Sequence, residues 1–189
     1  KYTAKDISLE GDFILCTRCQ AAGIYNAKNF GAPTNRKRFL CGDFPALEKT
    51  HTDDEAVKLK TVLNSLGDPL AKGEFEITDV NYPDLVLSNH QVTDFRYIHE
   101  LAPFEWQTAK RLKQDKGYMG KMSFPENENN PSRTVMATMS ASSREAMILR
   151  YKQDRYRLPT VREAASMMSF PIDYRFYGST KGIKHTLVG

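Results

Sequence analysis

The sequence predicts an α+β fold, and two kinds of pattern support this. Apolar residues recur three and four positions apart at Val161, Ala164, Ala165 and Met168, which indicates one buried face of a helix. Elsewhere, apolar runs of only three or four residues lie between glycines and prolines, a pattern typical of short strands. We therefore expect a few helices packed with small sheets.

The first forty or so residues contain the first expected strands. Apolar runs broken by glycines predict strand or irregular structure in residues 1–24, and residues 39–41 predict a short buried strand that ends at Gly42. Arg36 and Arg38 are two positions apart, so both guanidinium groups project from one face of an extended segment. Such a pair can bind phosphate or a base edge, but a solvated basic strand edge is the plainer interpretation.

Two helices are expected in the middle of the chain. Thr52 and Glu55 have the spacing of a capping box, and the apolar residues after them predict a helix over about 53–65. A second helix is predicted over about 104–114, with lysines and an arginine at its far end. Between the helices the apolar pattern is looser, as at the entry to a smaller domain.

A strand followed by a serine-rich loop is expected next. Residues 134–139 suit a strand, and residues 147–149 suit a strand that returns beside it. Small hydroxyl groups and an arginine between two strands can enter a DNA groove, although an ordinary hairpin loop has the same composition. The basic and hydroxyl side chains that we assign to DNA binding are Lys121, Arg133, Thr134, Ser140, Ser142, Ser143 and Arg144.

The helix near the C-terminus is the most strongly specified element. Thr160 and Glu163 form a second capping box, in which each side chain satisfies a backbone N–H of the other residue. Pro171 is expected to end this helix, and an aromatic turn follows over 170–177. By itself this pattern indicates packing, not chemistry.

Composition excludes some classes of protein. The net charge is −3 over residues 1–104 and +7 over residues 105–189, so the second half suits an anionic partner such as nucleic acid, or simply a solvated surface. No apolar run approaches the length of a membrane span. Three cysteines argue against a disulfide scaffold and for a reducing, cytoplasmic location. Cys16 and Cys19 form a lone CxxC pair, for which thiols are a better interpretation than a zinc site, and we expect no metal.

Two stretches resemble blocks of a known family. RLPTVREAASMMSFPIDYRFYGS, from Arg157, resembles the Arg-x-Leu-Thr-x-Arg-Glu block of the DNA (cytosine-5) methyltransferases, with Met168 where that family usually has Gln. NAKNFGAPTNRKRFLCG, from Asn26, resembles the segment of the same family that contains Gln-x-Arg-x-Arg, with Thr34 in place of the Gln. The two matches occur in the family's order.

The resemblance implies a division of the chain. Residues 1–70 would be the C-terminal piece of the S-adenosylmethionine-dependent α/β catalytic domain, residues 71–155 a small, mainly β target recognition domain, and residues 156–189 a capped helix and return segment. The Pro-Cys-Gln and Glu-Asn-Val motifs of the family and its Gly-rich cofactor block do not occur in this sequence. The chain is therefore expected to be part of a larger enzyme and to be inactive alone.

The resemblance also implies roles and partners. Arg36 and Arg38 fall on two active-site arginines, the second of which helps to hold a flipped cytosine. Thr160, Arg162 and Glu163 fall in a structural block. The expected partners are double-stranded DNA, S-adenosylmethionine in the full-length parent, and the remainder of the catalytic domain of a restriction-modification type enzyme. The alternative is a DNA-binding or protein-interaction module without catalysis.

Overall fold

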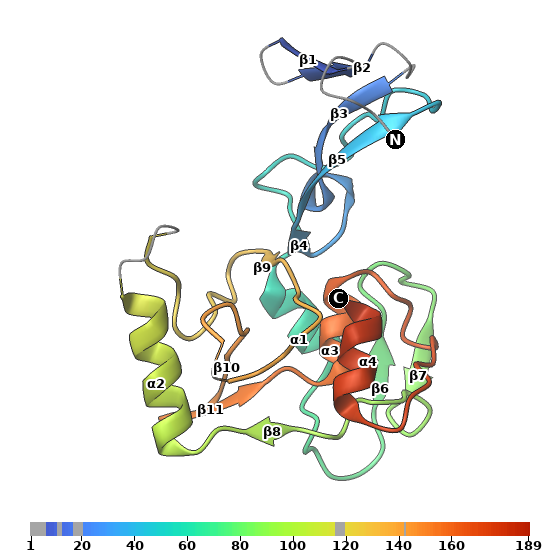
Figure 1. The fold of residues 1–189 in the computed structure, drawn as a ribbon. Helices are drawn as coiled ribbons and strands as arrows, with labels where there is room; N and C mark the ends of the chain where they lie inside the picture. Colours follow the sequence, from blue (N-terminus) through green and yellow to red (C-terminus); the bar gives the residue numbers. More distant parts are fainter. Residues whose placement is uncertain (1–6, 11–12, 17–20, 116–119, 142) are drawn as a thin grey trace.

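The computed structural model describes residues 7–10, 13–16, 21–115, 120–141 and 143–189, which form an α+β structure of small sheets and short helices (Figure 1). The helices are α1 (Leu59–Leu66), α2 (Pro103–Gln114), α3 (Val161–Met167), α4 (Lys181–Val188) and the 3-10 helix η2 (Ala27–Phe30). The strands are β1 (Ile7–Glu10), β2 (Phe13–Cys16), β3 (Ala21–Asn26), β4 (Thr34–Asn35), β5 (Lys37–Gly42), β6 (Glu76–Thr78), β7 (Val86–Ser88), β8 (His99–Glu100), β9 (Ser132–Arg133), β10 (Leu149–Lys152) and β11 (Arg155–Leu158). No helix in these ranges is both long and apolar enough to cross a membrane.

The strands form separate small sheets. β10, β11 and β8 make a three-stranded antiparallel sheet, and β6 pairs with β7. β3 and β5 form an antiparallel ribbon that projects away from the helices (Figure 1). β4 pairs in parallel with β9, far along the chain, where the ribbon joins the rest of the molecule.

The predicted capped helix is confirmed as α3, which lies between α1 and α4 (Figure 1). The Thr160 hydroxyl accepts a hydrogen bond from the Glu163 N–H, and the Glu163 carboxylate accepts one from the Thr160 N–H. All seven residues of α3 are buried, so the helix has no solvent face. It ends before Pro171, because Ser169 adopts a left-handed conformation and the Phe170 N–H returns to the Ala165 carbonyl.

One hydrophobic cluster surrounds α3 and draws on all three predicted segments of the chain. It contains Leu59, Val62 and Leu66 of α1, and also Ile77 and Phe95. A second, smaller cluster lies between α2 and the β10–β11–β8 sheet. The proposed boundaries at residues 70 and 155 thus fall within elements that share a core, and they remain a prediction.

The predicted start of α1 is wrong by about one and a half turns. The Thr52–Glu55 hydrogen bonds do form, but they close a turn, and the helix begins at Leu59. Asp53 is held instead by η2, since it accepts a hydrogen bond from Asn29 and pairs with Lys28. The N–H groups of Leu59 and the next residue donate to backbone carbonyls of the 128–130 loop, which caps the helix from a distance.

The predicted strand over 134–139 is also wrong. The pairing near it is confined to β9, and Leu149 of β10 pairs with Arg157 of β11 instead of returning beside 134–139. The serine-rich segment therefore does not lie at the tip of a hairpin. The second predicted helix, by contrast, is confirmed as α2.

The strand predicted at 39–41 is confirmed as part of β5, but its burial is not. Phe39 and Leu40 are 40% and 41% exposed, because β5 pairs with β3 in a two-stranded ribbon that no described helix covers. Cys41 is disulfide-bonded, whereas the small, odd number of cysteines was expected to argue against disulfides. Within the described ranges, no group of three or more His, Cys, Asp or Glu side chains could hold a metal ion.

Candidate functional site

The short pairing of β4 with β9 brings together two of the segments that the sequence assigns to a functional site. Thr34 lies opposite Ser132, and Asn35 lies opposite Arg133. The buried Thr34 hydroxyl donates to the Arg133 carbonyl, and the Thr134 hydroxyl donates to the Asn35 carbonyl, each at 3.2 Å. The arginine segment of residues 36–38 is therefore fixed beside residues 132–134, although about a hundred residues separate them in sequence.

A polar hollow of about 490 Å³ opens beside this junction. Two of its cations are paired, Lys28 with Asp53 at 2.9 Å and Arg133 with Glu126 at 2.5 Å. Lys121 is exposed and has no ion-pair partner in the described part of the chain. The hollow therefore carries a net positive charge, on a wall formed by Lys28, Asn35, Asp53, Lys121, Met122, Ser123, Glu126, Asn127, Asn130, Pro131 and Arg133.

Arg36 and Arg38 have different surroundings. Arg36 is partly buried, and its Nη1 lies 3.9 Å from the Met168 sulfur at the end of α3. Burial, and then the charge of Arg38, lower the pKa of Arg36 below its ordinary value. Arg38 is exposed, and among the described residues it donates only to the neighbouring Lys37 carbonyl, at 2.7 Å. Arg36 thus contacts the capped helix, while Arg38 presents its guanidinium to solvent.

Behind Arg133 lies a charged cluster that sequence reasoning missed. The Lys113 side chain is fully buried, and its Nζ donates to the Arg144 and Ala146 carbonyls at 2.9 and 2.5 Å. Burial, with Arg133 nearby, lowers the pKa of Lys113 to about 8. Burial also raises the pKa of Glu126. The signal was present, since Lys113 is four residues after the buried Ala109 on the same face of α2.

The serine-rich segment lies next to this cluster, since Lys113 donates to the Arg144 carbonyl. The Ser143 hydroxyl donates to Glu145 at 3.1 Å, and Ser140 is half-buried. The Arg144 guanidinium donates to the Leu112 carbonyl at 3.0 Å and to the Gly120 carbonyl, so it closes the C-terminal end of α2. Ser142 lies outside the described residues. The assignment of these side chains to DNA binding remains a prediction.

The residues assigned to a structural block form a buried network. Arg157 makes two hydrogen bonds of 2.6 Å to the Glu163 carboxylate, and these hold the cap of α3 against β11. Arg162 is fully buried and donates to the carbonyls of Thr93, Pro171 and Tyr174. It has no carboxylate partner among the described residues, and it ties two chain segments to the helix through their backbones.

A comparison with protein families gives a match over residues 20–189 to the family described as C-5 cytosine-specific DNA methylase. The chain belongs to this family. The match runs from the segment just before β3 to the end of α4, so it includes the β4–β9 junction and the α3 network. Neither a search of curated proteins nor a search of solved structures gave a match.

The family implies S-adenosylmethionine as the methyl donor. A phosphate- or nucleoside-binding loop of the usual kind leads from a strand through glycines into a helix. None of the described strands leads to its following helix in this way. These residues do not fit the cofactor, and we derive no step through it.

Proposed function

We propose that this chain is the target-recognition and adjoining C-terminal part of a DNA (cytosine-5) methyltransferase. The full-length parent would methylate carbon 5 of cytosine in a specific duplex sequence, with S-adenosylmethionine as donor, as a restriction-modification type enzyme. The observation that carries the proposal is the β4–β9 junction, which fixes the Arg36–Arg38 segment beside a basic hollow. The family match over residues 20–189 supports it.

The junction suits a duplex that is bound by its backbone while one base is displaced. A base must leave the stack to be modified, at a cost of a few kcal/mol, and the enzyme must hold it there. Lys121 and the partly exposed Arg133 are positioned to contact phosphates at the hollow. Arg38, exposed at the start of β5, is free to donate to an extruded cytosine.

Arg36 is given a positioning role in this proposal. Its contact with Met168 joins β4 and β5 to the end of α3, whose cap is fixed by the Arg157–Glu163 pair. The capped helix then acts as the rigid support on which the arginine segment is placed. Rigid support matters because a displacement of about 1 Å at a reacting group can reduce the rate about 100-fold.

The first test is Arg38→Ala in the full-length parent, with Arg150→Ala as control because Arg150 is an exposed arginine on β10. We expect Arg38→Ala to reduce methyl transfer about 100-fold or more, as removal of a single active-site donor commonly does. Duplex binding, measured at fixed salt, should change far less. Equal losses of binding and methylation would instead favour a binding module.

The second test concerns the hollow. Lys121→Ala in the parent should weaken binding to all duplexes about equally and reduce the slope of log affinity against log salt by about one. Lys60→Ala, an exposed lysine on α1, should leave that slope unchanged. A loss restricted to one DNA sequence would show that Lys121 contacts a base.

The chain by itself should bind DNA weakly and should not methylate it. Transfer of a tritiated methyl group to mixed-sequence DNA measures this directly. Activity from the isolated chain would show that it contains the catalytic apparatus and that the proposed division of the enzyme is wrong.

A further inference from the structure

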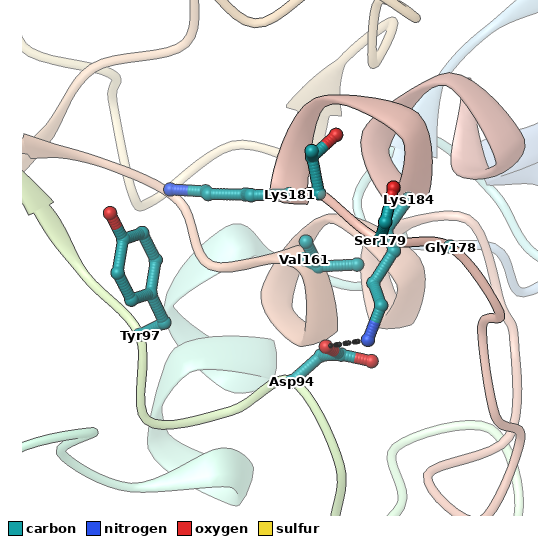
Figure 2. Close-up of a pocket in the computed structure, with 8 residues that line it drawn as sticks. Asp94, Tyr97, Val161, Gly178, Ser179, Lys181 and Lys184 are labelled. Carbon is teal, nitrogen blue, oxygen red and sulfur yellow. Dashed lines mark hydrogen bonds and ion pairs between the residues drawn. The ribbon is translucent and has the colours of Figure 1, made fainter.

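A second polar site lies between the first turns of α4 and residues 94–99 (Figure 2). It consists of two cavities of about 300 and 270 Å³ that share Tyr97 and Lys181 in their walls. We refer to these two cavities together as the α4 hollow. None of the side chains assigned to catalysis or DNA binding above lines it.

The two lysines of the α4 hollow differ in whether an acceptor binds their ammonium groups. Lys184 pairs with Asp94 at 2.6 Å, as the dashed line in Figure 2 marks. The Lys181 Nζ is shielded from solvent, and no hydrogen-bond acceptor reaches it among the described residues. It lies 5.2 Å from the centre of the Tyr97 ring, and burial lowers its pKa below the ordinary value. A shielded ammonium without an acceptor is costly, and a bound anion would offset that cost.

His185 provides an independent indication of a ligand site. It is only 3% exposed, lines the α4 hollow, and neither of its ring nitrogens has a hydrogen-bond partner in the described structure. Lys181 and His185 are four residues apart on α4, so they lie one above the other on the same face. Buried polar atoms in folded proteins nearly always have partners, and two adjacent residues without them indicate a site for a polar ligand.

The start of α4 adds backbone N–H donors and a partial positive charge to the positive charge of Lys181. The Thr180 hydroxyl accepts from the Ile183 N–H, so the cap is in place. The first N–H groups of this eight-residue helix have no intrahelical acceptor, and the positive end of its dipole lies at the wall of the hollow. With Lys184 neutralised by Asp94, the charge of Lys181 is uncompensated. The site therefore repels cations and attracts oxyanions.

We infer that the α4 hollow binds a phosphate-class oxyanion, held by the Lys181 ammonium, a His185 ring N–H and the first-turn N–H groups of α4. The cavities are large enough for one phosphate group. A backbone phosphate of DNA or a free phosphate would present the same oxygens. The inference does not depend on the proposed function, because it uses none of the residues at the β4–β9 junction.

The test uses the full chain and inorganic phosphate, with sodium chloride at matched ionic strength as reference. We expect phosphate at a tenfold excess over its Kd to raise Tm by about 3 to 5 °C relative to chloride. Lys181→Met should abolish that difference, and Lys60→Met, a change of the same kind at an exposed site, should preserve it. An equal phosphate response in Lys181→Met and the unaltered chain would overturn the inference.

A measurement without any substitution guards against a variant that does not fold. Phosphate should shift the ring resonances of His185 in the unaltered chain, with the same Kd as the thermal response. Resonances of the exposed His90 serve as reference. If the His90 and His185 shifts are equal, or if neither moves, binding in the α4 hollow is excluded.

A third arm distinguishes the two sources of the anion. A short DNA duplex should abolish the phosphate-dependent His185 shift if a backbone phosphate occupies the hollow. If the duplex leaves that shift intact, the ligand is a free phosphate. Lys121→Ala, at the β4–β9 junction, should not alter phosphate binding in either case, which separates this site from the proposed DNA contacts.

Discussion

The Arg157–Glu163 pair is the residue-level interaction on which the cap of α3 depends. The Glu163 carboxylate is 1% exposed, accepts two hydrogen bonds from Arg157, and accepts a third from the Thr160 N–H. Glu163→Gln would leave a buried guanidinium without a counter-charge, so we expect the free energy of unfolding to fall by about 3 kcal/mol. Urea denaturation of the chain measures this.

The control is another pair of the same type at the surface. Glu100 pairs with Arg155 through two short hydrogen bonds, but both side chains are substantially exposed. Glu100→Gln should therefore change the stability little, because water replaces the lost partner. A loss as large as that of Glu163→Gln would show that burial is not what distinguishes the two pairs.

Lys113 makes the stability depend on pH in a defined direction. Burial lowers its pKa to about 8 in the folded chain, whereas an unfolded lysine has its ordinary value of 10.5. Between these values the unfolded chain binds more protons, so this residue makes the folded state more stable as pH rises from about 8 to 10.5.

The measurement compares the unaltered chain with Lys113→Met, which keeps an unbranched side chain in the same space. Between about pH 8 and 10.5, denaturation should show that the stability of the variant rises less, or falls more steeply, than that of the unaltered chain. Parallel pH profiles would mean that Lys113 titrates normally in the folded state.

At the scale of elements, the C-terminal end of α3 contains two unfavourable features, both at Ser169. Ser169 has a φ of 63°, which costs a residue with a Cβ about 1 to 2 kcal/mol, and its shielded hydroxyl has no partner among the described residues. Ser169→Gly removes both the strain of the left-handed backbone and the unpartnered hydroxyl. The greater conformational entropy of glycine in the unfolded chain offsets part of this gain. We expect a net stabilisation of about 0.5 to 1 kcal/mol, measured by thermal and urea denaturation.

Ser169→Ala separates the two contributions. It removes the hydroxyl but keeps the left-handed strain, so it should stabilise the chain less than glycine does. If alanine and glycine stabilised it equally, the backbone conformation would not be a source of strain.

The elements also show how far the sequence allowed prediction. α3 was predicted well because its cap and apolar spacing are local, as the Thr160–Glu163 box demonstrates, and α2 was also predicted at close to its observed bounds. The start of α1 was not, because its first N–H groups are satisfied by carbonyls of a loop about seventy residues away. The strand expected at 134–139 failed for a related reason, since alternation predicts a strand only where a partner strand is present.

The candidate site shows the same division between local and distant information. The resemblance identified Arg36, Arg38 and the α3 block, and the family match covers them. Neither pattern nor resemblance indicated that Arg36 contacts Met168, or that the Arg144 guanidinium is occupied by backbone carbonyls. Those facts depend on how distant segments pack, and a single sequence does not specify that packing.

At the scale of the whole molecule, the shared core predicts one cooperative unit from α1 to α4. Leu59 is fully buried in the cluster that also contains residues of α3 and of the 76–95 segment. Leu59→Ala should reduce stability by about 2 to 5 kcal/mol and should accelerate amide hydrogen exchange in α1 and α3 together. Hydrogen exchange followed by mass spectrometry measures both helices at once.

Leu70→Ala is the control, because Leu70 is 45% exposed. It should change exchange in neither helix. Faster exchange confined to α1 in Leu59→Ala would instead support an independent domain that ends near residue 70.

The β4–β9 pairing also has a consequence for biosynthesis. Thr34 emerges from the ribosome well before Ser132 and Arg133, its partners across the junction. At 5 to 20 residues per second, that interval lasts about 5 to 20 seconds. During this interval the β3–β5 ribbon cannot yet pack against the rest of the protein through the β4–β9 pairing. Its exposed apolar residues are Ile24, Phe39 and Leu40. A nascent chain of this kind exposes an early binding segment for chaperones. Ribosomes arrested with chains that end before residue 133 should therefore retain more chaperone than ribosomes whose chains extend well beyond it.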